Sequence, residues 1–280
     1  MLRSVIRSMR PYQWYKNLVI FLCIIFSNNL LNLEMWLYLI MVFFVFCMLA
    51  GSQYMLNDIK DIEKDRLHSK KRYRPIAAGI LPARTALLIS FTIMTLSLVI
   101  AFAMGRLVGV VSLMYVVNSI AYSLYFKNYA IVDAIFIAVG FVIRAIAGCV
   151  TINITVSPWL ILCVFLLALV LAFGKRRHEL EEGQNSRDSL AQYTIAMSET
   201  LLNSSVSMLL MSYALYTISI HTTMMLTLPF VFYGTFRYVQ LINLKGIGEE
   251  VELLLKDKPF VLNVALWIFL TVLILYGGSF

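Results

Sequence analysis

The sequence is poor in charge. Only 14% of its 280 residues are Asp, Glu, Lys or Arg, roughly half of the share that soluble domains carry. Hydrophobic residues make up 61% of the chain, and the mean hydropathy is +0.83. A soluble fold of this length cannot bury so many apolar side chains, and disordered and collagen-like chains differ in composition. The composition therefore predicts an all-α, polytopic membrane protein whose solvent is lipid.

Cysteine and histidine are also scarce. The four cysteines lie in apolar runs with no paired spacing, which excludes a disulfide scaffold. We expect these thiols to pack as small apolar groups. The three histidines share no spacing, so none is assigned a catalytic role. Because no connection is long enough for a soluble domain, one membrane domain is expected over residues 1–280.

Long apolar runs are abundant, and a run of about 20 residues crosses a bilayer as a helix. Basic residues precede the first run, but a small-x-small cleavage site is lacking, which favours an uncleaved helix over a signal peptide. Nine spans are predicted: Trp14–Leu33, Met35–Leu56, Thr85–Met104, Leu107–Phe126, Ala130–Val150, Pro158–Gly174, Leu201–Ile220, Thr222–Arg237 and Phe260–Gly277.

Positive charge is distributed unevenly between the connections. Of the 23 Lys and Arg, only Arg106 lies on the side opposite to the N-terminus, when Arg144 within the fifth span is counted with the N-terminal side. Positively charged loops stay cytoplasmic in membrane proteins. The pattern therefore predicts an inner (plasma) membrane protein whose N-terminus and charged loops are cytoplasmic.

An acidic segment follows the second span. Asn57, Asp61 and Asp65 are spaced i, i+4 and i+8, so on a continuing helix they share one face, with Asp58 beside them. Carboxylates on one face repel each other, but oxygen ligands of this kind suit a hard cation such as Mg²⁺. The alternative is a solvated helix end with salt bridges to neighbouring Lys and Arg. We interpret Asn57, Asp61 and Asp65 as a magnesium site.

Basic residues follow this segment and recur after the sixth span. The first group includes Arg66, Lys70 and Arg74. An acidic, metal-binding face beside a basic loop suits a pyrophosphate ligand. The metal neutralises the bridging oxygens of the pyrophosphate, and Lys and Arg bind its outer oxygens. Attachment to anionic lipid is the alternative. The second group is either a phosphate cradle or a topology signal, and it comprises Lys175, Arg176 and Arg177, followed by Glu179 and Arg187.

Two charged residues interrupt the fifth span. A charge at this depth costs about 3 kcal/mol and by default indicates a functional site. Asp133 and Arg144 lie about 16 Å apart along a helix, which is too far for a direct ion pair. Each therefore requires a partner elsewhere or a wet cavity. Lys127 precedes this helix, and Lys16 and Asn17 occupy a matching place near the first span.

The acidic segment, read as N-D-x-x-D-x-x-x-D from Asn57 to Asp65, resembles the first aspartate-rich motif of the UbiA-type prenyltransferase superfamily. Residues 10–17, 65–79, 140–148 and 175–180 resemble its decaprenyl-phosphate phosphoribosyltransferase branch. The sequence departs from the pattern twice. The Lys-Arg-Arg-His-Glu-Leu cluster stands where prenyltransferases usually carry a second aspartate motif, which fits the phosphoribosyl branch. Ser69 stands where Pro is usual.

The resemblance implies a UbiA-like bundle and a magnesium-dependent glycosyltransferase. Such an enzyme moves 5-phosphoribosyl from phosphoribosyl pyrophosphate to a polyprenyl phosphate. It implies that Mg²⁺ binds Asn57, Asp61 and Asp65, with Asp58 nearby as a fourth catalytic residue. The implied substrate ligands are Lys70 and Arg74 for pyrophosphate, Lys175, Arg176 and Arg177 for the 5-phosphate, and Lys16, Lys127 or Arg144 for the acceptor. Asn17, Arg66, Glu179 and Arg187 complete the predicted substrate-binding set.

Two other functions fit parts of the pattern. A prenyltransferase would use a prenyl diphosphate and an aromatic acceptor, and the missing second aspartate motif counts against it. A transporter of lipid-linked sugars would need polar groups near mid-membrane, whereas the charges here gather on one side. We expect no nucleic-acid partner, and the sequence leaves a homo-oligomer open.

Overall fold

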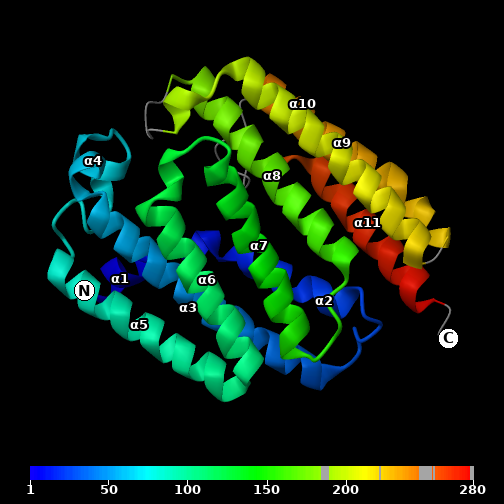
Figure 1. Ribbon diagram of the computed structural model, residues 1–280, viewed down its shortest axis with the longest axis horizontal. Helices are drawn as coiled ribbons and strands as arrows, with labels where there is room; N and C mark the ends of the chain where they lie inside the picture. Colours follow the sequence, from blue (N-terminus) through cyan, green and yellow to red (C-terminus); the bar gives the residue numbers. More distant parts are fainter. Residues whose placement is uncertain (184–188, 221, 246–253, 255, 278–280) are drawn as a thin grey trace. The chain divides into compact units, whose positions relative to one another are not determined.

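The computed structural model describes residues 1–183, 189–220, 222–245, 254 and 256–277. Every element in these residues is a helix, either α or 3₁₀ (Figure 1). The predicted all-α class is therefore confirmed. The chain divides into two compact units, and helix α7 (Val132–Thr151) contributes its first half to unit 2 and its second half to unit 1.

Unit 1 comprises Met1–Ser123 and Ile143–Thr155. Its long helix α3 packs against α5 over much of its length. A hydrogen bond of 2.8 Å joins the two helices, from the hydroxyl of Ser90 in α5 to the backbone carbonyl of Ser52 in α3. Both serines are buried. The elements other than α7 are α1 (Leu2–Ser8), η1 (Pro11–Phe21), α2 (Leu22–Ile25), α3 (Leu33–Lys60), α4 (Ile62–Leu67), η2 (Lys71–Tyr73), α5 (Ala83–Met104) and α6 (Arg106–Leu124).

The first predicted span is not one α-helix. Residues 11–25 form the 3₁₀ helix η1, with 11 residues, and the short α2, with 4, whereas the predicted end at Leu33 is the first residue of α3. At about 2.0 and 1.5 Å per residue the two extend roughly 28 Å, which is close to the thickness of the hydrocarbon layer. Tertiary contacts hold this conformation. Gly148 of α7 packs so closely that an added Cβ would lie 2.1 Å from the carbonyl oxygen of Ile20.

Unit 2 comprises Leu124–Val142 and Val156–Phe280. Its helices α8 and α9 pack along each other, and α10 packs against α11. The predicted eighth span begins as the 3₁₀ helix η5 and continues into α10. The elements other than α7 are η3 (Phe126–Asn128), α8 (Pro158–Glu181), η4 (Leu190–Gln192), α9 (Ile195–Ile220), η5 (Thr222–Thr227), α10 (Leu228–Lys245) and α11 (Lys258–Tyr276).

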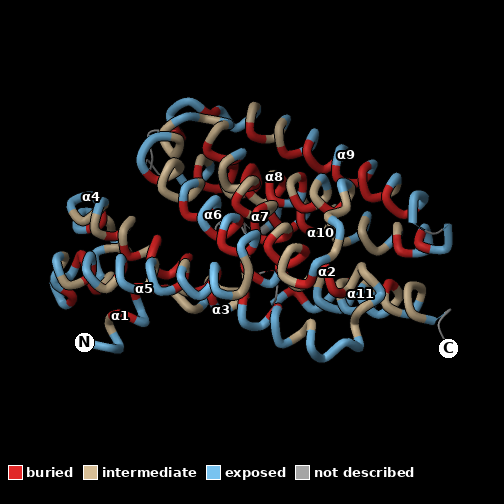
Figure 2. Tube along the Cα trace, turned by 60° about the horizontal axis from the view of Figure 1, so that its bottom comes forward, coloured by how far each residue is buried: buried red, intermediate tan, exposed pale blue. Residues whose placement is uncertain are grey.

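Seven helices in the described residues are long and apolar enough to cross a membrane, and the predicted count of nine is not reproduced. They are α3, α5, α6, α7, α8, α9 and α11. Helix α10 carries Arg237 near its middle, which forms a two-pronged ion pair with Asp257 at 2.9 and 3.2 Å. Exposed positions recur along α5 (Figure 2). Large apolar residues such as Leu88, Phe91 and Leu96 are among them. The chain is therefore a multi-pass membrane protein.

Candidate active site

The acidic residues continue along one helical path past the end of α3. Asp61 separates α3 from α4, yet its backbone N–H donates to the carbonyl of Asn57 at 3.0 Å, and Asp65 donates to Asp61 at 2.8 Å. Because these i, i+4 hydrogen bonds persist through the junction, Asn57, Asp61 and Asp65 keep the spacing of one helix face. The backbone spacing expected for the three residues is present, and their role as metal ligands stays a prediction.

Two arginines from distant segments hold the carboxylates of Asp58 and Asp65. Arg74 donates from Nη1 to Asp58 at 3.1 Å and to Asp65 at 2.6 Å, while Arg10 donates to the same oxygen of Asp58. Arg10 also stacks on the ring of Tyr54, 5.0 Å from its centroid. Asp58 is only 2% exposed. These contacts make Asp58 the fixed counter-ion of two arginines. Sequence reasoning did not single out Arg10 as a site residue, because its partner lies 48 residues away.

The amide of Asn57 is also held in place. Ser123 of α6 donates its hydroxyl to the Asn57 side-chain oxygen, and the Lys60 ammonium donates to the Ser123 carbonyl at 2.7 Å. Sequence reasoning missed Ser123, since a serine near a helix end carries no distinctive signal. These contacts attach the end of α3 to the end of α6 within unit 1.

The oxygen ligands of the acidic face fit magnesium. Within the described ranges, no three His, Cys, Asp or Glu side chains gather closely enough to hold a metal by themselves. Magnesium does not require such a cage, because it usually binds one or two carboxylates and completes its shell with water and substrate phosphates. The Asn57 amide with the Asp61 and Asp65 carboxylates supplies such a partial set.

The other predicted residues of the first basic loop lie at the surface of unit 1. Arg66 donates to the carbonyl of Ala77 at 3.2 Å and pairs with Glu63 at 3.0 Å, and Lys70 is exposed. The loop thus presents cations on the same polypeptide stretch as Arg74.

Arg144 has polar partners inside unit 1, as its depth requires. It donates to the Asn17 side-chain oxygen at 2.6 Å and to the Tyr115 hydroxyl at 2.8 Å. Asn17 in turn donates to the Cys47 sulfur at 3.2 Å. Arg144 and Asn17 are both buried, whereas Lys16 is half-buried and donates to Gln13 at 3.3 Å. These contacts favour a structural role for Asn17 and Arg144 over substrate binding.

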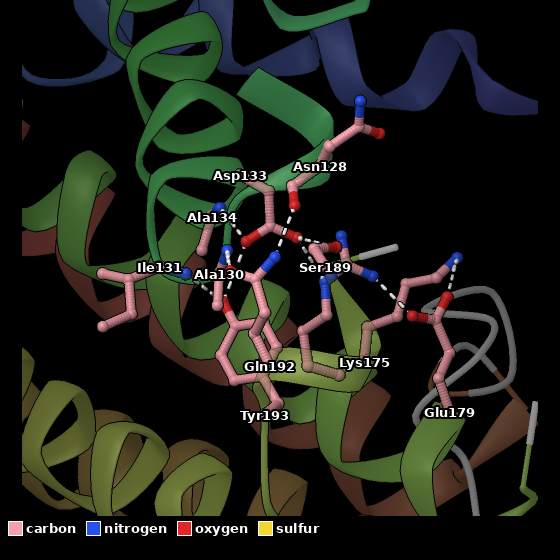
Figure 3. A network of polar contacts seen from close by, with 11 residues as sticks. Asn128, Ala130, Ile131, Asp133, Ala134, Lys175, Glu179, Ser189, Gln192 and Tyr193 are labelled. Carbon is pink, nitrogen blue, oxygen red and sulfur yellow. Dashed lines mark hydrogen bonds and ion pairs between the residues drawn. The ribbon is translucent and has the colours of Figure 1, made fainter. Parts of the chain in front are cut away.

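Asp133, the other charge of α7, is fully buried in unit 2 at the centre of a polar network (Figure 3). It accepts from Arg176 Nε at 2.8 Å, the Tyr193 hydroxyl at 2.8 Å, the Ser189 hydroxyl at 3.3 Å and the backbone N–H of Ala134 at 2.8 Å. We call Asp133, Arg176, Ser189 and Tyr193 the Asp133 network. It ties the start of α7 to the end of α8 and to the loop before α9.

The three consecutive cations of α8 diverge. Successive residues of a helix do not face one another, so each side chain meets different neighbours. Arg176 is 1% exposed and also donates to Glu179 at 2.5 Å. Arg177 is held by Glu181 at 2.9 Å, by Glu199 at 3.0 Å and by Asn243.

Lys175 differs from its two neighbours. Its side chain is 39% exposed, with the ammonium 3.8 Å from Glu179. The structure therefore does not show the three cations as a single phosphate cradle. Lys175 is the most accessible of Lys175, Arg176 and Arg177. The predicted ligand Arg187 lies outside the residues that the structure describes.

A turn before α7 carries Lys127 and is hydrogen-bonded to the loop before α9. The Gln192 amide donates to the carbonyl of Asn128 at 2.9 Å and accepts from the Ala130 N–H at 3.2 Å. The Tyr193 hydroxyl accepts from the Ile131 N–H at 2.6 Å. Burial raises the pKa of the Tyr193 phenol, and the charge of Asp133 raises it further, so the hydroxyl stays protonated and donates to Asp133.

Known proteins match the chain over almost its whole length. The sequence profile of the UbiA prenyltransferase family matches residues 18–248. The chain is 31% identical to the decaprenyl-phosphate phosphoribosyltransferase of Mycolicibacterium smegmatis, over 95% of this chain and 90% of that protein. It is 30% identical to the enzyme of the same name from Corynebacterium glutamicum, over 98% and 87%.

Solved structures agree with the sequence comparison. A UbiA homologue from Archaeoglobus fulgidus bound to GPP and Mg²⁺ superimposes with a TM-score of 0.75 at 19% identity, covering 97% of this chain and 99% of that one. A digeranylgeranylglyceryl phosphate synthase structure gives a TM-score of 0.67 at 19% identity, with coverage of 98% and 96%. At this identity the likeness concerns the fold alone. Together with the profile match, it shows that the chain belongs to the UbiA prenyltransferase family.

Proposed function

We propose that this chain transfers the 5-phosphoribosyl group from phosphoribosyl pyrophosphate to a polyprenyl phosphate and releases pyrophosphate. The observation that carries the proposal is the similarity, over 95% of the chain, to an enzyme named decaprenyl-phosphate phosphoribosyltransferase. The acidic face of unit 1 with its arginines supplies groups suited to this chemistry.

The reaction needs no strong base on the protein. An oxygen of the acceptor phosphate, already anionic at neutral pH, forms a bond to the anomeric carbon. The bond from that carbon to pyrophosphate breaks, and the leaving group takes the electron pair. The transition state resembles an oxocarbenium ion, as in other glycosyl transfers. The protein therefore has to bind two anions, orient them and stabilise the charge of the leaving group.

The residues proposed to bind the metal and the pyrophosphate of the donor all lie in unit 1. Asn57, Asp61 and Asp65 would hold Mg²⁺, which when bound neutralises charge on the departing pyrophosphate. Arg74 and Lys70 would contact the outer pyrophosphate oxygens, and Arg66 of α4 completes the proposed basic set. Asp58 keeps Arg74 in place, so its role in the set is to orient a ligand.

Lys175 is the proposed contact for the 5-phosphate, because Arg176 and Arg177 are buried as well as paired with carboxylates, whereas Lys175 is accessible. Glu179 orients Lys175 from 3.8 Å. For the acceptor phosphate, Lys127 or Lys16 remains the proposed ligand.

Residues 1–280 are proposed to act as one catalytic domain, since the family profile runs through both units. The active-site loops are proposed to face the cytoplasm, because they carry nearly all the Lys and Arg.

The direct test offers the purified protein radiolabelled phosphoribosyl pyrophosphate and decaprenyl phosphate, with Mg²⁺ or with a chelator. We expect labelled lipid and stoichiometric pyrophosphate with Mg²⁺, and none with the chelator. A parallel reaction offers geranyl diphosphate and an aromatic acid. Prenylation of the acid without phosphoribosyl transfer would replace the proposal with a prenyltransferase activity. Equal rates of phosphoribosyl transfer with chelator and with Mg²⁺ would contradict the metal requirement of the proposal.

Replacing Lys175 by alanine is expected to raise the KM for the phosphoribosyl donor. One lost hydrogen bond between charged groups corresponds to a roughly tenfold to hundredfold change. The KM for the lipid should stay within about twofold. Lys256→Ala, which removes another exposed lysine of unit 2, is the matched control. An unchanged donor KM in Lys175→Ala would exclude the 5-phosphate assignment.

A further inference from the structure

The turn before α7 contains a strained residue. Ile131 adopts a backbone φ of 67°. This left-handed conformation is a clear outlier for a β-branched residue and is energetically unfavourable. Such strain persists only where the surroundings impose it, and it often occurs where a protein must place a functional group.

Contacts from the loop before α9 impose this conformation. Tyr193 accepts from the N–H of the strained residue itself, and Gln192 contacts the backbone of Asn128 and Ala130 just before it, as described above (Figure 3). Tyr193 cannot easily move, because its hydroxyl also donates to the buried carboxylate of Asp133. Arg176 holds that carboxylate from its other oxygen. The buried ion pair of Asp133 and Arg176 therefore fixes the tyrosine that contacts the strained residue.

The same turn presents groups typical of the membrane interface. Lys127 lies between Tyr125 and Tyr129 in the sequence, and these two residues are 66% and 57% exposed. In membrane proteins exposed tyrosines gather at the depth of the lipid headgroups. The phosphate of a membrane-anchored polyprenyl phosphate lies at this depth, whereas the phosphoribosyl donor is a soluble anion.

We propose that Tyr193 and Asp133 are positioning residues that hold the strained 126–131 turn, so that Lys127 binds the phosphate of the acceptor lipid. The inference rests on the proposed function for the identity of the lipid phosphate. It chooses Lys127 over Lys16, and it assigns to the buried Asp133 a task in substrate placement as well as in stability.

The test removes the Tyr193 hydroxyl and then relieves the strain. Tyr193→Phe should raise the KM for decaprenyl phosphate roughly tenfold, which corresponds to one lost hydrogen bond, and leave the donor KM within about twofold. Adding Ile131→Asn should restore most of the loss, because asparagine tolerates the left-handed conformation. Tyr238→Phe, which changes another buried tyrosine of unit 2, is the control and should match the wild type.

A second measurement separates the two proposals. Binding of decaprenyl phosphate to the purified protein is measured without donor, in the wild type, in Tyr193→Phe and in Lys127→Ala. Weaker binding in both variants supports the inference even if no phosphoribosyl transfer is found, in which case only the proposed function fails. Equal lipid affinity in all three proteins would overturn the inference. So would a rise of both KM values together, or a Tyr193→Phe defect that Ile131→Asn leaves unchanged, because either result indicates general loss of structure.

Discussion

Asp61→Ala and Asp65→Ala are each expected to lower turnover by about 10³-fold or more while the protein stays folded. Both carboxylates lie on the helical path that continues α3, and both are proposed to hold the metal that stabilises pyrophosphate as it leaves. Metal stabilisation of a developing charge contributes several kcal/mol, which corresponds to a loss of this size. Asp65→Ala leaves Arg74 paired with Asp58, so the arginine does not become an isolated charge.

Glu63→Ala is the matched control for these variants. Glu63 lies between the two aspartates and carries the same charge, but its side chain is 83% exposed and forms only a surface pair with Arg66. We expect its turnover to equal that of the wild type. Binding of Mn²⁺ to the resting protein gives a readout independent of turnover, and it should weaken in Asp61→Ala and Asp65→Ala alone. Wild-type turnover in either aspartate variant would contradict the metal assignment.

Arg176→Ala is expected to produce the largest loss of stability. The substitution leaves Asp133 and Glu179 buried without the guanidinium that now contacts both. Removing one partner of a buried ion pair typically costs about 3–5 kcal/mol. The melting temperature of the detergent-solubilised protein should therefore fall markedly. Glu63→Ala removes an exposed pair in unit 1 and should change stability by less than about 1 kcal/mol.

A double variant distinguishes stability from ligand binding at this position. Arg176→Met combined with Asp133→Asn removes both charges of the pair, and such replacements are often close to neutral for stability. We expect it to melt above Arg176→Ala. If Arg176→Ala kept the wild-type melting temperature and only raised the donor KM, Arg176 would be a phosphate ligand, as the family resemblance of the sequence implies.

Hydropathy and spacing predict much of this fold, because lipid and helix geometry act locally. The apolar runs locate seven spanning helices, and the i, i+4 spacing places Asn57, Asp61 and Asp65 on one face. Hydropathy predicts the ends of the helices less well. Helix α8 continues to Glu181, beyond the predicted end at Gly174, since backbone hydrogen bonds do not stop at the membrane surface.

Partners far apart in the sequence could not be predicted. Asp133 was expected to require a partner, but nothing in the pattern identifies Arg176, 43 residues away. The close approach of η1 to Gly148 of another helix is likewise not visible in the sequence pattern. The buried state of Arg176 also escapes sequence reasoning, because three adjacent cations look alike until the packing of their helix is known.

The contact between Arg10 and Asp58 gives the first ten residues a meaning that their position does not suggest. A short, basic stretch ahead of an apolar run resembles a leader that anchors or orients a chain. Here its last residue neutralises a buried carboxylate at the end of α3. The two positions are therefore subject to a shared constraint, and a truncation that removed Arg10 would take one of two guanidiniums from Asp58 at the end of unit 1 that is proposed to bind the donor.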